Sequence, residues 1–277
     1  MQHLRAEQAD ADVSPRERAA ARRANVEKLV SSDEPVALFL DIDGTLLDVA
    51  LTPSTVHVPP MLPELLDALS TRLSGALAII TGRPLAEADR LLSPSRFIGA
   101  GVHGGQMRLS VEGAIETLTP SFNPALQADI RKIVHELPGV VFEDKGSGIA
   151  LHYRLAPNLQ EPLMLLLEAL LPLYPDQFKI CGGRKVVELL PVGFSKGRAL
   201  RMIASLPQFA NRMPVMVGDD ISDVDAFQAA EDLSGFGLKV AGENFAKDEA
   251  SFQGPTDVLG WLQGLARTQN GRSLRGT

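Results

Sequence analysis

The sequence predicts an α/β protein: a doubly wound parallel-sheet core with an inserted α+β cap domain. Two continuous apolar segments, residues 36–40 and 76–80, are each followed by a helical pattern, as buried parallel strands are. This alternation stops near residue 107 and returns after Pro191. Between these points short strand pairs accompany two helical segments, which predicts a second, smaller domain inside the first.

The first part of the core is predicted at residues 34–106, after a helical extension at residues 1–33. Ser14, Pro15 and Glu17 stand where a helix N-cap, first position and N3 glutamate belong, so a helix is expected to about residue 30. Its apolar stripe is weak, which favours a peripheral helix such as a docking arm. The core elements expected next are strand 36–40, helix 63–73, strand 76–80, a helix that begins near Pro84, and strand 96–99.

The cap is predicted at residues 107–190. Alternation around Glu112–Gly113 indicates a hairpin at residues 107–118. Apolar residues at helical spacing predict a helix at residues 126–137, and the leucine-rich segment 159–173 predicts a second, buried one. The other cap strands are expected at residues 140–142, 149–153, 178–181 and 185–190.

The second part of the core is predicted at residues 191–266. Ser195 and Lys196 open a helix that extends through residue 203, and residues 214–217 form a buried strand that leads into an acidic segment. A last strand at residues 237–240 and a last helix at residues 257–265 follow. The polar segment 267–277 is expected to be a frayed tail.

Composition narrows the classes of function. The 277 residues carry 27 basic and 34 acidic side chains, a net charge of −7, which argues against nucleic acid as the main partner. No apolar segment approaches the roughly 18 residues that span a bilayer, and the first residues lack the apolar stretch of a secretory signal. The single cysteine, Cys181, excludes an internal disulfide. We therefore expect a cytoplasmic monomer without membrane or nucleic-acid partners.

Two carboxylates directly follow the first buried strand. Asp41 and Asp43 lie two positions apart and precede Gly44 and Thr45. Ligands of open α/β sheets bind at the carboxyl ends of the strands, so these side chains are expected at a site. Two like charges this close need a cation or a shared proton, and Mg²⁺ suits oxygen ligands. An Asp-rich turn without a ligand is the structural alternative.

A hydroxyl and a lysine occupy comparable positions farther along the chain. Thr81 follows the second buried strand, and its hydroxyl with the amides of the turn at Gly82 predicts a phosphate cradle. A plain helix N-cap is the alternative for Thr81. Lys196 stands at the start of a helix, where it would offset phosphate charge or be an ordinary surface lysine.

An acidic cluster follows the strand at residues 214–217. It comprises Asp219, Asp220, Asp223 and Asp225. Metal coordination explains this clustering after a central strand, whereas a solvated face does not. Asp220 or Asp223 could instead cap the helix that follows.

Together, in this order, the four segments resemble the haloacid dehalogenase (HAD) superfamily of phosphohydrolases. Its phosphatases carry aspartate two residues after the nucleophile, as at Asp43, whereas its ion pumps carry threonine and need membrane helices. The resemblance implies that Asp41 is the nucleophile and Asp43 the general acid and base. It also implies Mg²⁺ bound by the Asp41 carboxylate, the Asp43 carbonyl and Asp219, with Asp220 and Asp223 close by, and phosphoryl oxygens bound by Thr81 and Lys196.

The cap segments are similar to those of the trehalose-6-phosphate phosphatase family. They are Phe142–Lys145, Leu151–Arg154 and Val187–Pro191, and the core segment Gly101–Gly104 is similar as well. The resemblance implies that Glu143, Lys145 and Glu188 hydrogen-bond the sugar. Arg83, His103 and Arg154 are further candidates for contacts with the phosphate or sugar. The structural alternative is an ion pair between Lys145 and either Glu143 or Glu188.

The expected activity is Mg²⁺-dependent hydrolysis of a sugar phosphate, trehalose 6-phosphate, through an aspartyl-phosphate. Three alternatives stay open at this point. One is a phosphatase for another sugar phosphate, such as sucrose phosphate or a glycosyl-phosphoglycerate. The second is a phosphosugar mutase, which returns the phosphate to the sugar. The third is a non-enzymatic phospho-receiver or sugar-phosphate-binding regulator, although receivers are much shorter than this chain.

Overall fold

The computed structural model describes residues 14–32, 34–49, 56–119, 122–183 and 185–267. Seven strands in these ranges form a core sheet in the order β11-β10-β1-β2-β3-β4-β5. The first five of these, from β11 to β3, are parallel, as the continuous apolar segments predicted. The core strands are β1 (Val36–Leu40), β2 (Leu77–Ile80), β3 (Ile98–Gly101), β4 (Gln106–Arg108), β5 (Glu116–Thr117), β10 (Met213–Gly218) and β11 (Phe236–Lys239).

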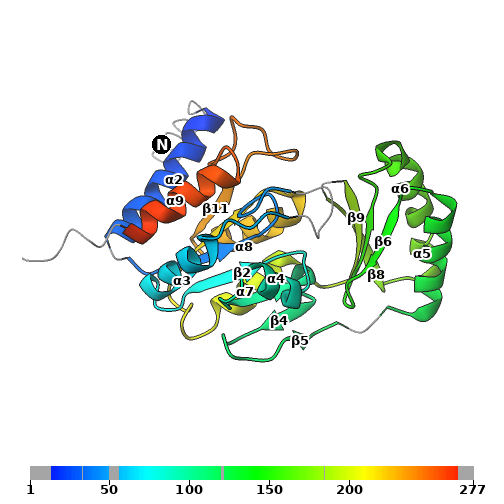
Figure 1. Ribbon diagram of the computed structural model, residues 1–277, viewed down its shortest axis with the longest axis horizontal. Coiled ribbons are helices and arrows are strands. Elements are labelled where there is room, and N and C mark those ends of the chain that lie inside the picture. Colours follow the sequence, from blue (N-terminus) through cyan, green and yellow to red (C-terminus); the bar gives the residue numbers. More distant parts are fainter. Residues whose placement is uncertain (1–13, 33, 50–55, 120–121, 184, 268–277) are drawn as a thin grey trace, which may run out of the picture.

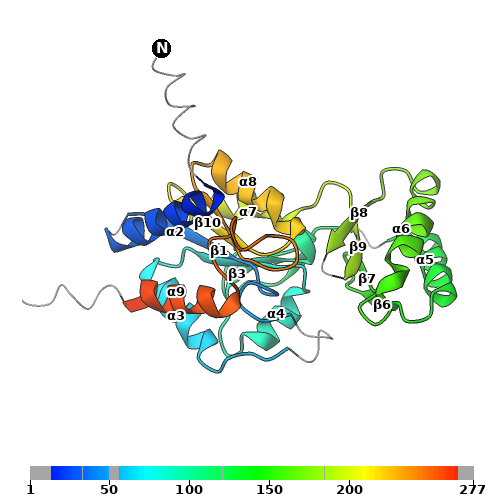
Figure 2. The ribbon, with the colours of Figure 1, turned by 90° about the horizontal axis from the view of Figure 1, so that it is seen from above.

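Helices cover both faces of the core sheet, which makes it a three-layer domain. Figure 2 shows α7 and α8 on one face and α3, α4 and α9 on the other. Every residue of β1 is buried between these layers, in agreement with its uninterrupted apolar sequence. The core helices are α3 (Leu62–Arg72), α4 (Leu85–Leu91), α7 (Lys196–Ala204), α8 (Val224–Asp232) and α9 (Pro255–Arg267), with short 3₁₀ turns η2 (Val102–Gly104) and η5 (Ile221–Asp223).

The cap is a separate layer pair beside the core (Figure 1). Its four antiparallel strands follow the order β6-β7-β9-β8, and two helices cover one face. Leu126, Ile130, Leu163 and Leu167 of these helices are buried against the sheet. The cap elements are α5 (Pro124–Glu136), β6 (Val141–Asp144), β7 (Ile149–His152), η3 (Pro157–Leu159), α6 (Gln160–Glu168), η4 (Leu171–Leu173), β8 (Phe178–Gly183) and β9 (Val186–Pro191).

The hairpin at residues 107–118 differs from the expectation, which assigned it to the cap. Its strand β4 pairs antiparallel with β3, through Gly99 and Arg108 among others, so the hairpin extends the core sheet. The alternating pattern indicated a hairpin correctly but could not show which sheet it joins. Arg108 is buried and donates two hydrogen bonds of 2.7 Å to Asp89 in α4, which fastens the hairpin to the core.

Two helices also depart from the expectation. The N-terminal helix α2 (Pro15–Ser31) has the expected capping box, but it is not peripheral, because Val26 and Val30 are buried in the core cluster. The helix expected at residues 159–173 is shorter and only partly buried: α6 ends at Glu168, and Leu165 is 62% exposed. The tail expected at residues 267–277 lies outside the described residues, apart from Arg267. Within those residues, no helix combines the length and apolarity needed to cross a membrane.

Candidate active site

The predicted site residues of the core meet at one edge of the sheet. Asp41 follows β1, Thr81 follows β2 and Asp219 follows β10, and β1 pairs with both of the other strands. Since all three strands are parallel, their carboxyl ends lie side by side. This edge faces the cap (Figure 1).

Three buried carboxylates form the centre of the site. Oxygen atoms of Asp41, Asp219 and Asp223 lie within 4.8 Å of one another. Lys196 reaches this cluster from the start of α7, and its Nζ donates to Asp41 Oδ1 at 2.9 Å and to Asp223 Oδ1 at 2.7 Å. Lys196 is 2% exposed, so the surface-lysine alternative is wrong.

The electrostatics of this cluster are those of a cation site. Burial raises the pKa of Asp41 to about 8, although the Lys196 ammonium acts in the opposite direction. Burial, with the charges of Asp41 and Asp223, raises the pKa of Asp219 to about 9. Carboxylates in this state hold protons unless a cation joins them. The cluster therefore has the oxygen donors that a divalent cation would bind in place of these protons.

Local backbone geometry leaves room at the cluster. Gly44 has φ +79°, and a Cβ at this position would lie 2.0 Å from Asp219 Oδ2, so the turn after Asp43 requires glycine. On the other side, Asp223 Oδ2 accepts from the amides of Asp219 and Asp220 at 3.1 and 3.0 Å. Asp220 caps η5 and accepts from Asn244 at 2.6 Å. Asp220 therefore caps η5, as the structural alternative predicted, and it does so within the acidic cluster that follows β10.

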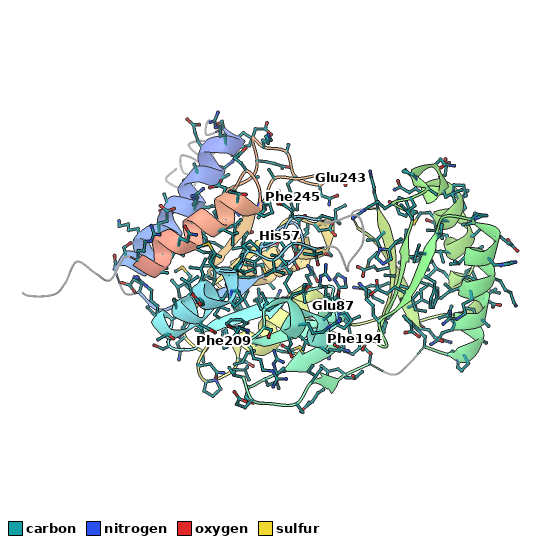
Figure 3. The ribbon with its side chains drawn as sticks, in the orientation of Figure 1. His57, Glu87, Phe194, Phe209, Glu243 and Phe245 are labelled. Atoms are coloured by element: carbon teal, nitrogen blue, oxygen red, sulfur yellow. The ribbon has the colours of Figure 1, made fainter. Side chains whose placement is uncertain are left out.

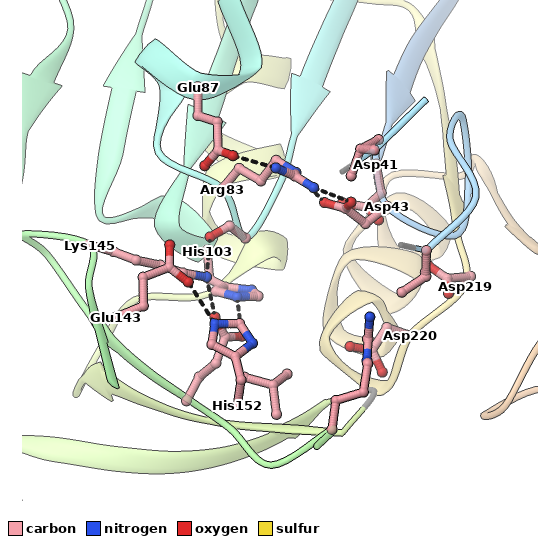
Figure 4. A pocket seen from close by; sticks show the side chains of 16 residues that line it. Asp41, Asp43, Arg83, Glu87, His103, Glu143, Lys145, His152, Asp219 and Asp220 are labelled. Atoms are coloured by element: carbon pink, nitrogen blue, oxygen red, sulfur yellow. Dashed lines mark hydrogen bonds and ion pairs between the residues drawn. The ribbon is translucent and has the colours of Figure 1, made fainter. Parts of the chain in front are cut away.

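Arg83 and Asp43 form a bidentate pair at the mouth of the site. Arg83 Nε and Nη2 each donate to an Asp43 oxygen at 2.6 Å, and Nη1 donates to Glu87 at 2.5 Å (Figure 4). The Arg83 side chain is 8% exposed. The Asp43 carboxylate is therefore held in one orientation by a charge-assisted fork.

The cap brings a second set of charges to the same cleft. Lys145 Nζ donates to Glu188 Oε1 at 2.7 Å and to the Gly82 carbonyl at 2.9 Å. The first contact is the ion pair between Lys145 and Glu188 that the sequence offered as the structural alternative. Glu188 Oε2 also lies 2.6 Å from Nε2 of His103 in the core. The predicted site residues that line this cleft are Asp41, Asp43, Gly82, Arg83, His103, Glu143, Lys145, Arg154, Glu188, Asp219 and Asp220.

Three predicted residues lie behind the lining of this cleft rather than in it: Thr81, Lys196 and Asp223 are at most 2% exposed. The Thr81 hydroxyl accepts from the Arg83 amide at 3.2 Å and so shapes the turn.

Comparison with known proteins decides the family. Residues 39–254 match a sequence profile described as trehalose-phosphatase. The chain belongs to the trehalose-phosphatase family. "Probable trehalose-phosphate phosphatase" of Sinorhizobium fredii is 43% identical over 206 residues, which cover 74% of this chain and 77% of that protein. "Trehalose-6-phosphate phosphatase" of Escherichia coli is 35% identical over 228 residues, covering 82% and 85%.

A solved structure agrees with this trehalose-phosphatase fold. The C-terminal domain of C. albicans trehalose-6-phosphate phosphatase superposes with a TM-score of 0.76, covering 88% of this chain and 96% of that one. At 21% identity the likeness concerns the fold alone. It confirms the predicted parallel-sheet core with an inserted α+β cap, and the family membership confirms that the chain is a phosphatase.

Two polar residues that line this trehalose-phosphatase cleft, Glu87 and His152, were not among the predicted site residues, and neither were three valines. Glu87 of α4 accepts a hydrogen bond from Arg83 Nη1. Figure 3 shows Glu87 on the side of the core that faces the cap. Its signal was the four-residue spacing from Arg83: Arg83 lies just before α4, and Glu87 lies in the first turn of that helix. His152 Nε2 lies 2.7 Å from Glu143 Oε2. The signal for His152 was the alternation of side chains along a strand. Glu143 of β6 pairs with Ala150 of β7, and His152, two residues after Ala150, lies on the same face of the sheet.

The buried Glu188 predicts a pH-dependent contribution to the stability of this trehalose-phosphatase. Burial alone would raise its pKa, but His103 and Lys145 outweigh burial and lower it below the ordinary 4.5. Ionised Glu188 therefore stabilises the fold above pH 4.5, and this contribution is lost as the pH falls through the lowered pKa. We expect Glu188→Gln to reduce the free energy of unfolding by about 2 kcal/mol at neutral pH. In urea titrations the difference in the free energy of unfolding between Glu188→Gln and the wild type should become smaller below pH 4.5. A difference that does not change with pH would contradict a stabilising role of ionised Glu188.

Proposed function

We propose that the protein hydrolyses trehalose 6-phosphate to trehalose and phosphate. The observation that carries the proposal is the shared cleft, which the core carboxylate Asp41 and the cap pair Lys145–Glu188 line together. A phosphate at the strand ends and a sugar against the cap would therefore occupy one continuous site. The names of the two bacterial relatives support this substrate.

Asp41 is the proposed nucleophile. One of its oxygens bonds to phosphorus while the bond from phosphorus to the sugar oxygen breaks, which leaves an aspartyl-phosphate and frees trehalose. Lys196 holds Oδ1 of Asp41 at 2.9 Å, so the orientation of the attacking carboxylate is set from below the site. Water then attacks this intermediate, phosphate leaves and the Asp41 carboxylate is restored.

Asp43 is the proposed acid and base. It donates a proton to the departing sugar oxygen, and it later accepts one from the attacking water. The fork from Arg83 holds the Asp43 carboxylate in one orientation at the mouth of the site. In the acid step one Asp43 oxygen gives its proton to the sugar oxygen, so this oxygen must leave its contact with Arg83 and face the substrate.

The cluster of Asp41, Asp219 and Asp223 is the proposed site of Mg²⁺. Its carboxylate oxygens are the hard donors that this ion prefers. Mg²⁺ bound there would offset the charge of the phosphoryl group and orient it for in-line attack. The Asp43 carbonyl and Asp220 are proposed to lie beside the ion, as the resemblance implies.

The phosphoryl oxygens are proposed to contact the turn at Gly82, which lines the cleft. Thr81 and Lys196 are buried beneath this turn and the nucleophile. They support phosphate binding by shaping the turn and by supplying positive charge.

The sugar is proposed to bind between the two domains. Glu143, Lys145 and Glu188 offer charged acceptors and a donor at fixed positions, which suits recognition of hydroxyl groups. Arg83, His103 and Arg154 line the same cleft and are further candidates for these contacts.

A substrate panel tests this function. We expect phosphate release from trehalose 6-phosphate to require Mg²⁺, to stop with chelator and to exceed release from sucrose phosphate or a glycosyl-phosphoglycerate. Glu188→Gln should lower kcat/KM for trehalose 6-phosphate by about 100-fold. Glu168→Gln, on the exposed side of α6, is the matched control and should behave as the wild type.

Four other results would contradict parts of this proposal. Equal rates on all sugar phosphates would show that the protein is a phosphatase without preference for trehalose 6-phosphate. Unchanged kinetics of Glu188→Gln would show that Glu188 does not take part in sugar recognition. Return of the phosphate to the sugar would indicate a mutase, and an aspartyl-phosphate stable for hours would indicate a receiver.

A further inference from the structure

The loop between β11 and α9, residues 240–254, carries a side chain that contacts the acidic cluster. Asn244 Nδ2 in this loop donates to Asp220 Oδ1 at 2.6 Å, and the Ile221 amide donates to the same oxygen at 2.7 Å. Because a carboxylate oxygen is an acceptor, the NH₂ group of Asn244 faces Asp220. Two short donors on one oxygen fix the orientation of the Asp220 carboxylate, which lines the cleft beside Asp219 (Figure 4).

The turn that presents Asn244 is held on both sides. The Gly242 amide donates to the Phe245 carbonyl at 3.0 Å, which closes the turn around Asn244. Phe245 is 6% exposed, and its ring packs against α8. The two arms of the loop are joined where the Ala241 amide donates to the Phe252 carbonyl at 2.8 Å. A displacement of the second arm is therefore transmitted to the turn.

The helix α2 holds this second arm of the loop. The guanidinium of Arg23 stacks over the Phe252 ring, 4.8 Å from its centroid, and Nη1 donates to Asp257 Oδ1 at 2.9 Å. Ser251 Oγ donates to the Ala19 carbonyl of α2 at 3.2 Å. Phe252 is fully buried, and a cation–π contact is stronger where water is excluded. This support comes from outside residues 39–254, the segment that matches the family profile.

We propose that Asn244 is a positioning residue of the cation site, which acts through Asp220 and is itself held in place by α2 through Arg23. The inference rests on the proposed function, in which Asp220 lies beside Mg²⁺. A carboxylate that is already oriented loses less conformational freedom when an ion binds. The amide suits this role because it orients Asp220 without adding a positive charge that would repel the ion.

Calorimetric titration of the full chain with Mg²⁺, without substrate, tests this role through a dissociation constant and not through activity. Asn244→Ala is expected to raise Kd for Mg²⁺ by about tenfold. Since Asn244 acts through Asp220, Asn244→Ala should cause no further increase in a chain that already carries Asp220→Ala. Asn25→Ala, on the exposed face of α2, is the matched control and should bind Mg²⁺ as the wild type does.

The part played by α2 is tested with Arg23→Met, which keeps an apolar stem but removes the guanidinium. We expect Kd for Mg²⁺ to rise by about fivefold, whereas the matched control Lys28→Met, in the exposed last turn of α2, should leave it unchanged. Emission from Trp261, the single tryptophan, which is 3% exposed beside Phe252, shows whether each variant is folded. If Arg23→Met does not fold, Ser251→Ala removes another bond between the loop and α2 and must raise Kd instead.

The outcomes separate this inference from the proposed function. A folded Asn244→Ala with the Kd of the wild type overturns the positioning role and leaves the cation site in place. A further increase of Kd in the chain with Asp220→Ala would show that Asn244 does not act through Asp220. A folded Arg23→Met with the Kd of the wild type overturns the part of α2.

The wild type itself supplies the remaining comparison. If it does not bind Mg²⁺, the cation site is wrong and this inference with it. If Mg²⁺ binds and the variants change Kd as expected, but no phosphate is released from trehalose 6-phosphate, the positioning role stands and the proposed substrate is wrong.

Discussion

Asp41→Asn is expected to abolish phosphate release, with kcat reduced by about 10⁵-fold. Asparagine has nearly the shape of aspartate and can still accept from Lys196 through its oxygen. It lacks the anionic oxygen that attacks phosphorus, so the aspartyl-phosphate cannot form. The measurement is phosphate release from trehalose 6-phosphate, together with the mass of the acid-quenched protein. The wild type should carry a transient phosphoryl group and the variant should carry none.

The fold of Asp41→Asn should be intact, which separates lost chemistry from lost structure. Asp41 is buried beside Asp219 and Asp223, and burial disfavours its charged form more than the Lys196 ammonium favours it, so a neutral side chain at this position should not destabilise the fold. The temperature of unfolding without divalent cation should therefore be no lower than that of the wild type. Turnover within tenfold of the wild type would show that another group is the nucleophile.

The core part of the site could be predicted from the sequence because it depends on strand ends. Apolar runs at residues 36–40 and 214–217 indicated buried parallel strands, and such strands bring their carboxyl ends together. Asp41 and Asp219 were therefore each expected at the carboxyl end of a strand, and the family resemblance implied that both bind the same Mg²⁺. The structure adds that β1 and β10 pair directly, with Leu40 opposite Val217.

The remaining features depend on tertiary contacts that periodicity does not encode. The fork from Arg83 to Asp43 joins two turns about 40 residues apart, and nothing in either turn specifies a partner. The hairpin at residues 107–118 has the alternation of any edge strand, so the pattern could not assign it to the core sheet. The helix α2 has a weak apolar stripe, yet Val26 is fully buried, because burial depends on where the helix docks.

Lys196→Met is expected to cost both activity and stability. Methionine keeps the apolar stem but removes the ammonium that lies 2.9 Å from Asp41 and 2.7 Å from Asp223. Burial alone would lower the pKa of Lys196, but these two carboxylates outweigh burial and raise it, so the native side chain is charged. We expect kcat to fall by about 10³-fold. The free energy of unfolding without divalent cation should fall by about 3 kcal/mol.

Lys239→Met is the matched control for Lys196→Met, because it removes a lysine that forms an ion pair at the surface rather than in the interior. Lys239 pairs with Glu249 at 3.4 Å, and its side chain is 36% exposed, so Lys239→Met should cost at most about 1 kcal/mol. Urea titrations of both variants with and without Mg²⁺ make the comparison. If the carboxylate cluster is a cation site, Mg²⁺ should restore more stability to Lys196→Met than to Lys239→Met, because the ion replaces the lost positive charge. Equal stability of the two variants would mean that Lys196 does not balance the cluster.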